Sequence, residues 1–106
     1  IDGYTSVDNT AVGYASLNKS FSGYANTPVG SNSLNCNIHG HNNVALGFNA
    51  VPANTTGYGN VGVGNYSIHN NKTGNLNIPI GHGAGYYIDK DDSNKLFISS
   101  HNVDKD

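Results

Sequence analysis

The chain has 106 residues, a net charge of −2, 36% hydrophobic residues and 11% charged residues. It contains no Arg, and a chain without a basic patch is a poor candidate for binding nucleic acid. No apolar run approaches the length of a membrane span and no secretion signal is recognisable, so we expect no membrane insertion by these residues.

The composition favours β structure without disulfides. Asn occurs 18 times and Gly 14 times, whereas Glu is absent, and this combination disfavours helices. The single cysteine, Cys36, has no partner within the chain. Met is also absent, which predicts that the sequence is a piece of a longer chain.

A 17-residue repeat organises the chain from Asn9 onward. Each repeat begins with Asn and carries an aliphatic residue and Gly at its positions 4 and 5. A fixed period of this kind predicts a stacked, elongated architecture. The repeats begin at Asn9, Asn26, Asn43, Asn60 and Asn77, and Asn94 is expected to begin a sixth, degenerate copy.

The first five repeat positions predict a ladder, a core and a corner. An Asn amide both donates and accepts hydrogen bonds, so stacked copies at position 1 predict a ladder between coils. Positions 2 and 4 share one face of a strand, which we expect to face the core, and position 5 suits a corner with positive φ. The residues of positions 4 and 5 are Val12, Val29, Leu46, Val63, Ile80, and Gly13, Gly30, Gly47, Gly64, Gly81.

Small residues at positions 3 and 8 are expected to face outward, because position 3 alternates with the aliphatic positions. Their uniform smallness predicts close packing against another subunit. Position 9 is aliphatic in four repeats and predicts the inward side of a second strand, and position 15 is Gly in four repeats and Asp91 in the fifth. The predicted trimer contacts at position 3 are Ala11, Pro28, Ala45, Gly62 and Pro79.

Together these positions predict an all-β fold, a parallel β-solenoid or β-roll of about five 17-residue coils. Residues 1–88 are expected to form the array, and residues 89–106 a degenerate last coil and an exit toward the next domain. Each coil supplies only three or four aliphatic side chains, so a single solenoid this thin has a small core. We therefore expect the chain to associate with copies of itself.

The repeat resembles those of two groups of fibrous proteins. Asn9–Leu17 (NTAVGYASL), Asn54–Gly57 (NTTG), Asn77–Gly85 (NIPIGHGAG) and Ser93–Ser99 (SNKLFIS) carry the resemblance. They are similar to the head repeats of YadA-like trimeric autotransporter adhesins and to the NTAVGY-type repeats of viral and phage fibre and tail proteins. The resemblance implies a homotrimer of β-rolls, left-handed in the adhesin heads, that serves as an attachment or spacer element. The coil is longer than the usual adhesin-head coil by a polar loop, which favours the fibre proteins.

Histidines in the variable loops are weak candidates for metal binding. His39 and His41 form a His-x-His pair near Cys36, and these residue types ligate zinc. We interpret the pair as exposed loop residues. The alternative is a metal on a trimer axis, where three copies of His69 or of His82 would serve equally well.

Two other motifs have the spacing of a ligand site. Asp89 and Asp91, with Ser93, match the first half of a calcium loop, but the expected Gly and the final bidentate acid are missing. We interpret them as a solvated acidic turn. The stretch 57–62 matches the Gly-x-Gly-x-x-Gly pattern, yet a dinucleotide loop needs a strand before it and a helix after it. We expect neither a metal nor another cofactor.

Tyrosines beside Asn amides are the candidates for glycan contact, because sugar sites combine aromatic faces with a few polar groups. The alternative is packing over the corners or between subunits. The candidates are Tyr14, Tyr24, Tyr58 and Tyr66. Four sequons, at Asn18, Asn54, Asn65 and Asn71, are expected from composition alone.

The functional hypothesis is a non-enzymatic, trimeric head or shaft segment of a fibre on a virion or cell surface. Such a fibre would attach to a host cell or to a surface glycan outside the cell. No catalytic arrangement of residues is recognisable. The alternatives are a purely structural spacer, a polysaccharide-cleaving tail protein, and an ice-binding solenoid. An ice-binding array would require threonines at position 2, where Thr changes to Val and Ile after Thr27.

Overall fold

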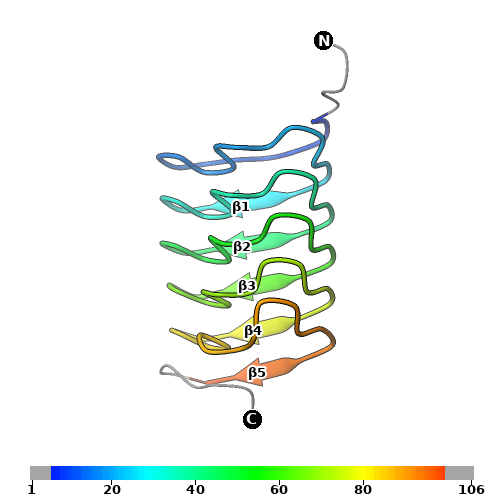
Figure 1. The fold of residues 1–106 in the computed structure, drawn as a ribbon. Coiled ribbons are helices and arrows are strands. Elements are labelled where there is room, and N and C mark those ends of the chain that lie inside the picture. The colour runs from blue at the N-terminus through cyan, green and yellow to red at the C-terminus, as the bar shows by residue number, and fades with distance from the viewer. Residues whose placement is uncertain (1–5, 100–106) are drawn as a thin grey trace.

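The computed structural model describes residues 6–99, which form a stack of coils running from the N-terminal to the C-terminal end (Figure 1). Within this range the chain forms one sheet of five parallel strands in chain order, and no helix. The all-β prediction is thus confirmed, and the stacked parallel strands agree with a β-solenoid. The strands are β1 (Thr27–Val29), β2 (Val44–Leu46), β3 (Val61–Val63), β4 (Ile78–Ile80) and β5 (Leu96–Ile98).

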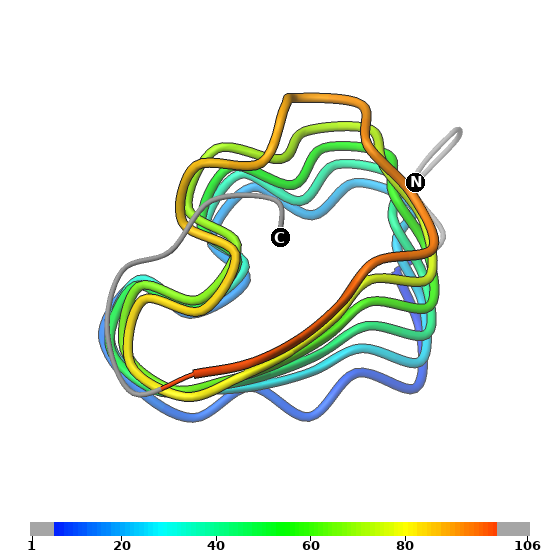
Figure 2. The same cartoon turned by 90° about the horizontal axis from the view of Figure 1, so that it is seen from below.

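The strands pair in register with the 17-residue period. Thr27 pairs with Val44 and Val44 with Val61, so residues at one repeat position lie directly above one another. An isolated bridge between Val12 and Val29 extends the same register to the first coil. Viewed along the stack, the coils nearly superimpose, and each outline is indented on one side (Figure 2).

The predicted orientation of the strands is wrong. The middle residue of every strand is buried, and the residues on either side of it are exposed or half-buried. Position 3 therefore faces the interior, whereas the aliphatic residues of positions 2 and 4 lie on the outside. Ala45 is fully buried, for example, while Leu46 beside it is 37% exposed.

A narrow interior explains this inversion. Position 8 and 9 side chains from the opposite wall, such as Ser67 and Val51, come close to the strand. A Cβ added to Gly62 would overlap the Val51 Cγ2 methyl and would lie 2.7 Å from Ser67 Oγ. Small residues are required at position 3 because the coil is thin, and not because another subunit packs outside.

The wall opposite the sheet is a turn and not the second strand that we predicted. Position 7 and 9 residues have positive φ, including the β-branched Val51 at 49° and Ile68 at 43°. Left-handed backbone is uncommon for such residues. Hydrogen bonds to neighbouring coils hold it in place: Val51 N donates to Ser67 O at 2.8 Å, and Asn49 N donates to Ser31 O at 2.9 Å.

The side chains at repeat position 9 face inward, as predicted, and they contribute to two buried clusters. One contains Leu34, Ala45, Ala50 and Val51, with Leu17 packed against it, and the other contains Ile68, Ala84, Ile88 and Phe97. The aliphatic residue of position 9 is replaced by Gly85 in the fifth coil. Phe97 compensates, because a Cβ on Gly85 would lie 3.1 Å from its ring.

The predicted Asn ladder is present and buried. Each Oδ1 accepts a hydrogen bond from the backbone N–H of the next ladder residue, as from Asn43 N to Asn26 Oδ1 at 3.0 Å and from Asn60 N to Asn43 Oδ1 at 2.9 Å. Each Nδ2 donates to the carbonyl at position 15, as from Asn43 to Gly57 O at 2.9 Å. The amides thus tie the start of each strand to the next coil and to the corner of their own coil. Equivalent bonds join Asn9, Asn26, Asn60 and Asn77.

A second Asn ladder, at repeat position 12, was not predicted. Asn37, Asn54 and Asn71 are buried, and Asn54 Nδ2 donates to Asn37 Oδ1 at 2.7 Å. The two ladders meet at shared acceptors, since Gly57 O also accepts from Asn54 Nδ2 at 3.1 Å. The signal was available in the sequence, where Asn recurs at this position in three successive repeats.

The last complete coil contains one extra residue. Lys95 N, and not Asn94 N, donates to Asn77 Oδ1, at 3.0 Å, and β5 pairs with β4 through Ile78 and Leu96. The predicted start of the sixth repeat at Asn94 is therefore wrong by one position. For the same reason Asp92, and not Asp91, takes the place of the position 15 glycine, and its carbonyl accepts from Asn77 Nδ2 at 2.8 Å. The part of the predicted exit segment at 100–106 lies outside the described residues.

Candidate functional site

The outer face of the sheet carries two continuous columns of aliphatic and Thr side chains, which we call the aliphatic face. Ile78 and Ile80 are each 40% exposed, and Val29 and Leu46 are each 37% exposed. The face contains no charged residue. It consists of Thr10, Thr27, Val44, Val61, Ile78 and Leu96 at position 2, and Val12, Val29, Leu46, Val63, Ile80 and Ile98 at position 4.

The backbone makes this face regular. In-register parallel strands repeat at about 4.8 Å, so the side chains form parallel rows at that spacing. From the first coil to β4, position 5 ends each row with a glycine at positive φ, as expected, for example 131° at Gly47. The Asn ladder holds the other end of these rows, so β1 to β4 are fixed at both ends. Ser99 takes the place of the glycine after β5.

The predicted trimer contacts at position 3 cannot form a contact surface. Pro28, Ala45, Gly62 and Pro79 are buried inside a single chain, and only Ala11, in the first coil, is exposed. The serines and alanines of position 8 that we also expected outside are buried as well, including Ser33, Ala50, Ser67 and Ala84. Any side-by-side contact through the sheet must therefore use the aliphatic face.

Two of the candidate glycan-binding tyrosines have a ring face already occupied. His41 lies between Tyr24 and Tyr58, with ring centroids 4.7 and 5.1 Å apart and planes within 9° of parallel. Tyr24, His41 and Tyr58 occupy repeat position 16 in three consecutive coils, so the stack of rings runs along the solenoid axis. Tyr14, by contrast, is 82% exposed. The alternative of packing over the corners therefore describes Tyr24 and Tyr58 well.

Tyr66 is the centre of an aromatic cluster in the C-terminal half. Its ring centroid lies 5.6 Å from that of Phe48, 6.1 Å from His69 and 6.0 Å from His82. Tyr86 stacks on His69 at 4.6 Å, and Tyr87 meets Tyr86 edge-on at 4.8 Å. The cluster joins residues from both sides of the position 9 turn, which gives its rings a packing role.

The candidate metal ligands do not come together. His39 Nδ1 is hydrogen-bonded to Ser22 Oγ, whereas His41 is held between the two tyrosines. Cys36 Sγ lies 3.7 Å from Asn35 Oδ1. Among residues 6–99 no group of three or more His, Cys, Asp and Glu side chains is arranged to hold a metal ion.

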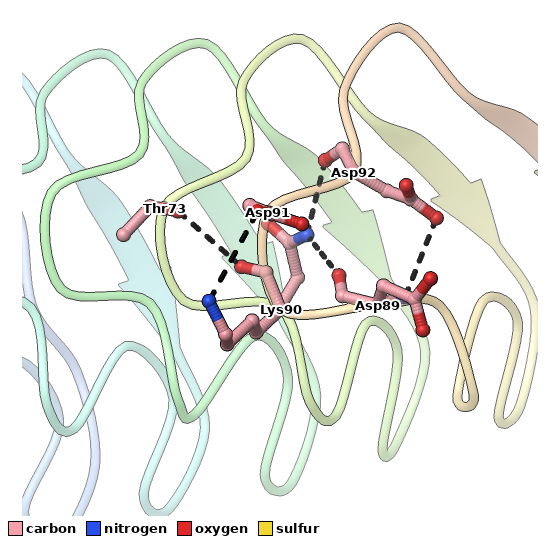
Figure 3. Close-up of polar contacts among 6 residues, drawn as sticks. Thr73, Asp89, Lys90, Asp91 and Asp92 are labelled. Atoms are coloured by element: carbon pink, nitrogen blue, oxygen red, sulfur yellow. Dashed lines mark hydrogen bonds and ion pairs between the residues drawn. The ribbon is translucent and has the colours of Figure 1, made fainter.

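In the acidic turn at the extra residue, Asp91 lies beside Lys90 and apart from Asp89, whereas Asp92 lies on the side of Asp89 (Figure 3). Asp91 lies 4.0 Å from the Lys90 ammonium, and both side chains are largely exposed, so this ion pair contributes little to stability. Asp92 Oδ2 instead accepts from Asp89 N at 3.3 Å. Lys90 O is the acceptor for Thr73 N, at 2.9 Å, which keeps the turn attached to the coil above.

The sequons divide into buried and exposed positions. Asn54 and Asn71 belong to the second ladder and are inaccessible in the folded chain. Asn18 and Asn65 are exposed, although Asn65 Oδ1 accepts from Phe48 N at 2.9 Å. Only the second pair could carry a modification without unfolding.

The described residues contain no helix that is long and apolar enough to cross a membrane. Comparisons of the chain with models of protein families, with curated proteins and with solved structures find no match.

Proposed function

We propose that the chain is a non-enzymatic segment of the head or shaft of a surface or virion fibre. Three copies assemble side by side through the aliphatic face, and the fibre attaches to a host cell or surface glycan outside the cell. The exposure of the aliphatic face carries this proposal. The repeat's resemblance to fibre and adhesin proteins supplies the trimer and the attachment role.

The aliphatic face is unusual for a chain that remains alone in water. Soluble monomers rarely expose large continuous apolar patches, and such patches commonly mark interaction sites. On β1 to β4 the inversion is systematic, because the buried middle residue is Pro, Ala or Gly while the Val, Leu and Ile residues beside it lie outside. Aliphatic side chains in this position gain by being covered.

The size of the face suits an interface between subunits. Its twelve residues present on the order of 800 Å² of accessible surface, comparable to what one partner contributes to a stable complex. A second copy matches it well, since its rows have the same spacing and neither surface carries a charge. Side chains of one copy can then fit between the rows of another.

Sedimentation equilibrium of the chain tests the assembly. We expect a mass three times the 11.1 kDa of one chain. Leu46→Lys should shift the mass toward that of one chain, because it buries a charge in the interface. Asn70→Lys, at an exposed loop position, is the matched control and should leave the mass unchanged. A parent chain that stays monomeric and folded at the highest soluble concentration would refute the assembly.

A purely structural spacer is the second candidate, favoured by the ring stacking that occupies Tyr24 and Tyr58. Binding of the assembled chain to a glycan array separates the two roles. Attachment to glycans predicts a signal that Tyr14→Ala or Tyr66→Ala reduces. A folded assembly that binds neither glycans nor host cells would exclude the attachment role and support the structural spacer.

A further inference from the structure

The aliphatic face is not uniform along the axis. From β1 to β5 its pairs of residues change from Thr27 and Val29 to Val and Leu, then two Val, then Ile78 and Ile80, and finally Leu and Ile. The outer side chains of β4 and β5 are larger than those of β1, and among the strands only β1 carries a hydroxyl group on this face. The face therefore has a polarity that its backbone lacks.

Strands β1 and β4 allow a fair comparison, because each has a coil on both sides. Ile78 and Ile80 in β4 are both 40% exposed, whereas Thr27 is half-buried and Val29 is 37% exposed. The exposed fractions are similar, so the larger side chains of β4 present more apolar surface. Thr27 also has a hydroxyl group, which is costly to cover without a partner.

Folding of the coil does not require this gradient. From β1 to β4 the Asn ladder and the glycine corner keep the same geometry, with Asn26 Nδ2 donating to Gly40 O at 2.9 Å and Asn77 Nδ2 donating to Asp92 O at 2.8 Å. Position 2 and 4 side chains point away from the interior, so the core does not select their size. Their increase toward β5 must serve something outside the coil.

The C-terminal end also has the bulkier core. Phe97, the middle residue of β5, is 3% exposed and packs with Ile68, Ala84 and Ile88. The corresponding residue is Pro in both β1 and β4, Ala45 in β2 and Gly62 in β3. The outer surface of β5 is therefore supported by a large buried side chain, and a pre-organised surface loses less entropy when it binds.

We propose that copies of this chain first join at β4 and β5, and that contact then spreads toward β1. The inference rests on the proposed side-by-side assembly. It implies that the copies are parallel, because an antiparallel pair would place the Ile rows against the Thr rows.

Two variants that introduce the same charge test the polarity. Ile80→Lys and Val29→Lys each place a Lys on the aliphatic face, at nearly equal exposure. Analytical ultracentrifugation over a dilution series gives the concentration at which half of each variant is assembled. We expect Ile80→Lys to raise it at least tenfold and Val29→Lys less than threefold, with unchanged far-UV circular dichroism. Equal effects, or a larger effect of Val29→Lys, would overturn the polarity.

The parent chain supplies a second test that needs no variant. On this face Ile occurs only in β4 and β5, so Ile methyl groups report on the C-terminal end, and Val12 and Val29 report on the other end. During a rise in concentration, methyl NMR should show Ile78 and Ile80 responding before Val12 and Val29. The reverse order would contradict the proposal. A parent chain that never associates would instead refute the proposed function itself.

Discussion

Removing one amide of the buried Asn ladder should destabilise the whole chain. Asn43 is fully buried and has partners on its own coil and on both neighbouring coils. Its Oδ1 accepts from Asn60 N at 2.9 Å, and its Nδ2 donates to Gly57 O at 2.9 Å and to Asn26 Oδ1 at 3.2 Å. The substitution Asn43→Ala removes all of these bonds together.

The loss can be estimated from the groups left behind. Gly57 O keeps Asn54 Nδ2 as a donor, and Asn26 Oδ1 keeps the backbone N–H of residue 43. Asn60 N, however, loses its acceptor, and a buried unsatisfied N–H costs about 1–3 kcal/mol. With the other lost hydrogen bonds at roughly 1 kcal/mol, we expect a total of about 3 kcal/mol.

Urea denaturation followed by circular dichroism, at one fixed chain concentration, measures the effect. The exposed Asn18→Ala is the control, and surface substitutions of this kind usually change stability by less than about 0.5 kcal/mol. Asn43→Asp should be at least as harmful as Asn43→Ala, because it puts a carboxylate oxygen against Gly57 O. If Asn43→Ala and Asn18→Ala shift the midpoint equally, the ladder does not stabilise the fold as argued.

Three further substitutions test other parts of the structure. Ala45→Leu should lower the free energy of unfolding in urea by about 1–3 kcal/mol through overpacking of the narrow interior, whereas unchanged stability with impaired assembly would show that position 3 faces outward. Gly47→Ala should cost more than about 2 kcal/mol in thermal denaturation, because φ is 131° and the new Cβ would lie 2.8 Å from the Gly64 carbonyl carbon. His41→Ala should cost about 1 kcal/mol through lost stacking with Tyr24 and Tyr58, whereas His41→Phe should retain most of it; equal losses would contradict the stack's role.

The 17-residue period predicted the stacking, the register and the Asn ladder, because each depends on residues that recur in space as they recur in sequence. It could not tell which strand face points inward. Alternation separates Ala45 from Val44 and Leu46, but burial depends on the width of the coil. That width is set by the opposite wall, where Val51 and Ser67 approach the strand. Apolar residues usually identify the core, as they do at position 9, but at positions 2 and 4 of the strands they lie outside.

Backbone conformation limited the remaining predictions. Val51 and Ile68 look like strand residues, since β-branched residues favour strands, and their positive φ depends on hydrogen bonds from neighbouring coils. The shift from Asn94 to Lys95 was also hidden, because an Asn happens to stand where the unbroken period would place it. The same error affected the aliphatic face. The sequence correctly grouped the residues of positions 2 and 4 on one side of the strands, but we expected that side to face the core.

The direction of the inter-coil hydrogen bonds has a mechanical consequence. Backbone bonds such as Val44 N to Asn60 O, and the Asn ladder beside them, run along the stack, and the described residues begin in its first coil and end in its last (Figure 1). Tension between the two ends would load these bonds in series, so a single chain should yield one coil at a time. Each 17-residue coil would release about 50–60 Å of extended chain in place of about 5 Å of rise. If neighbouring copies are bound to the aliphatic face, each step would also require their dissociation from that coil. Lateral association would therefore increase the force needed to unfold the stack.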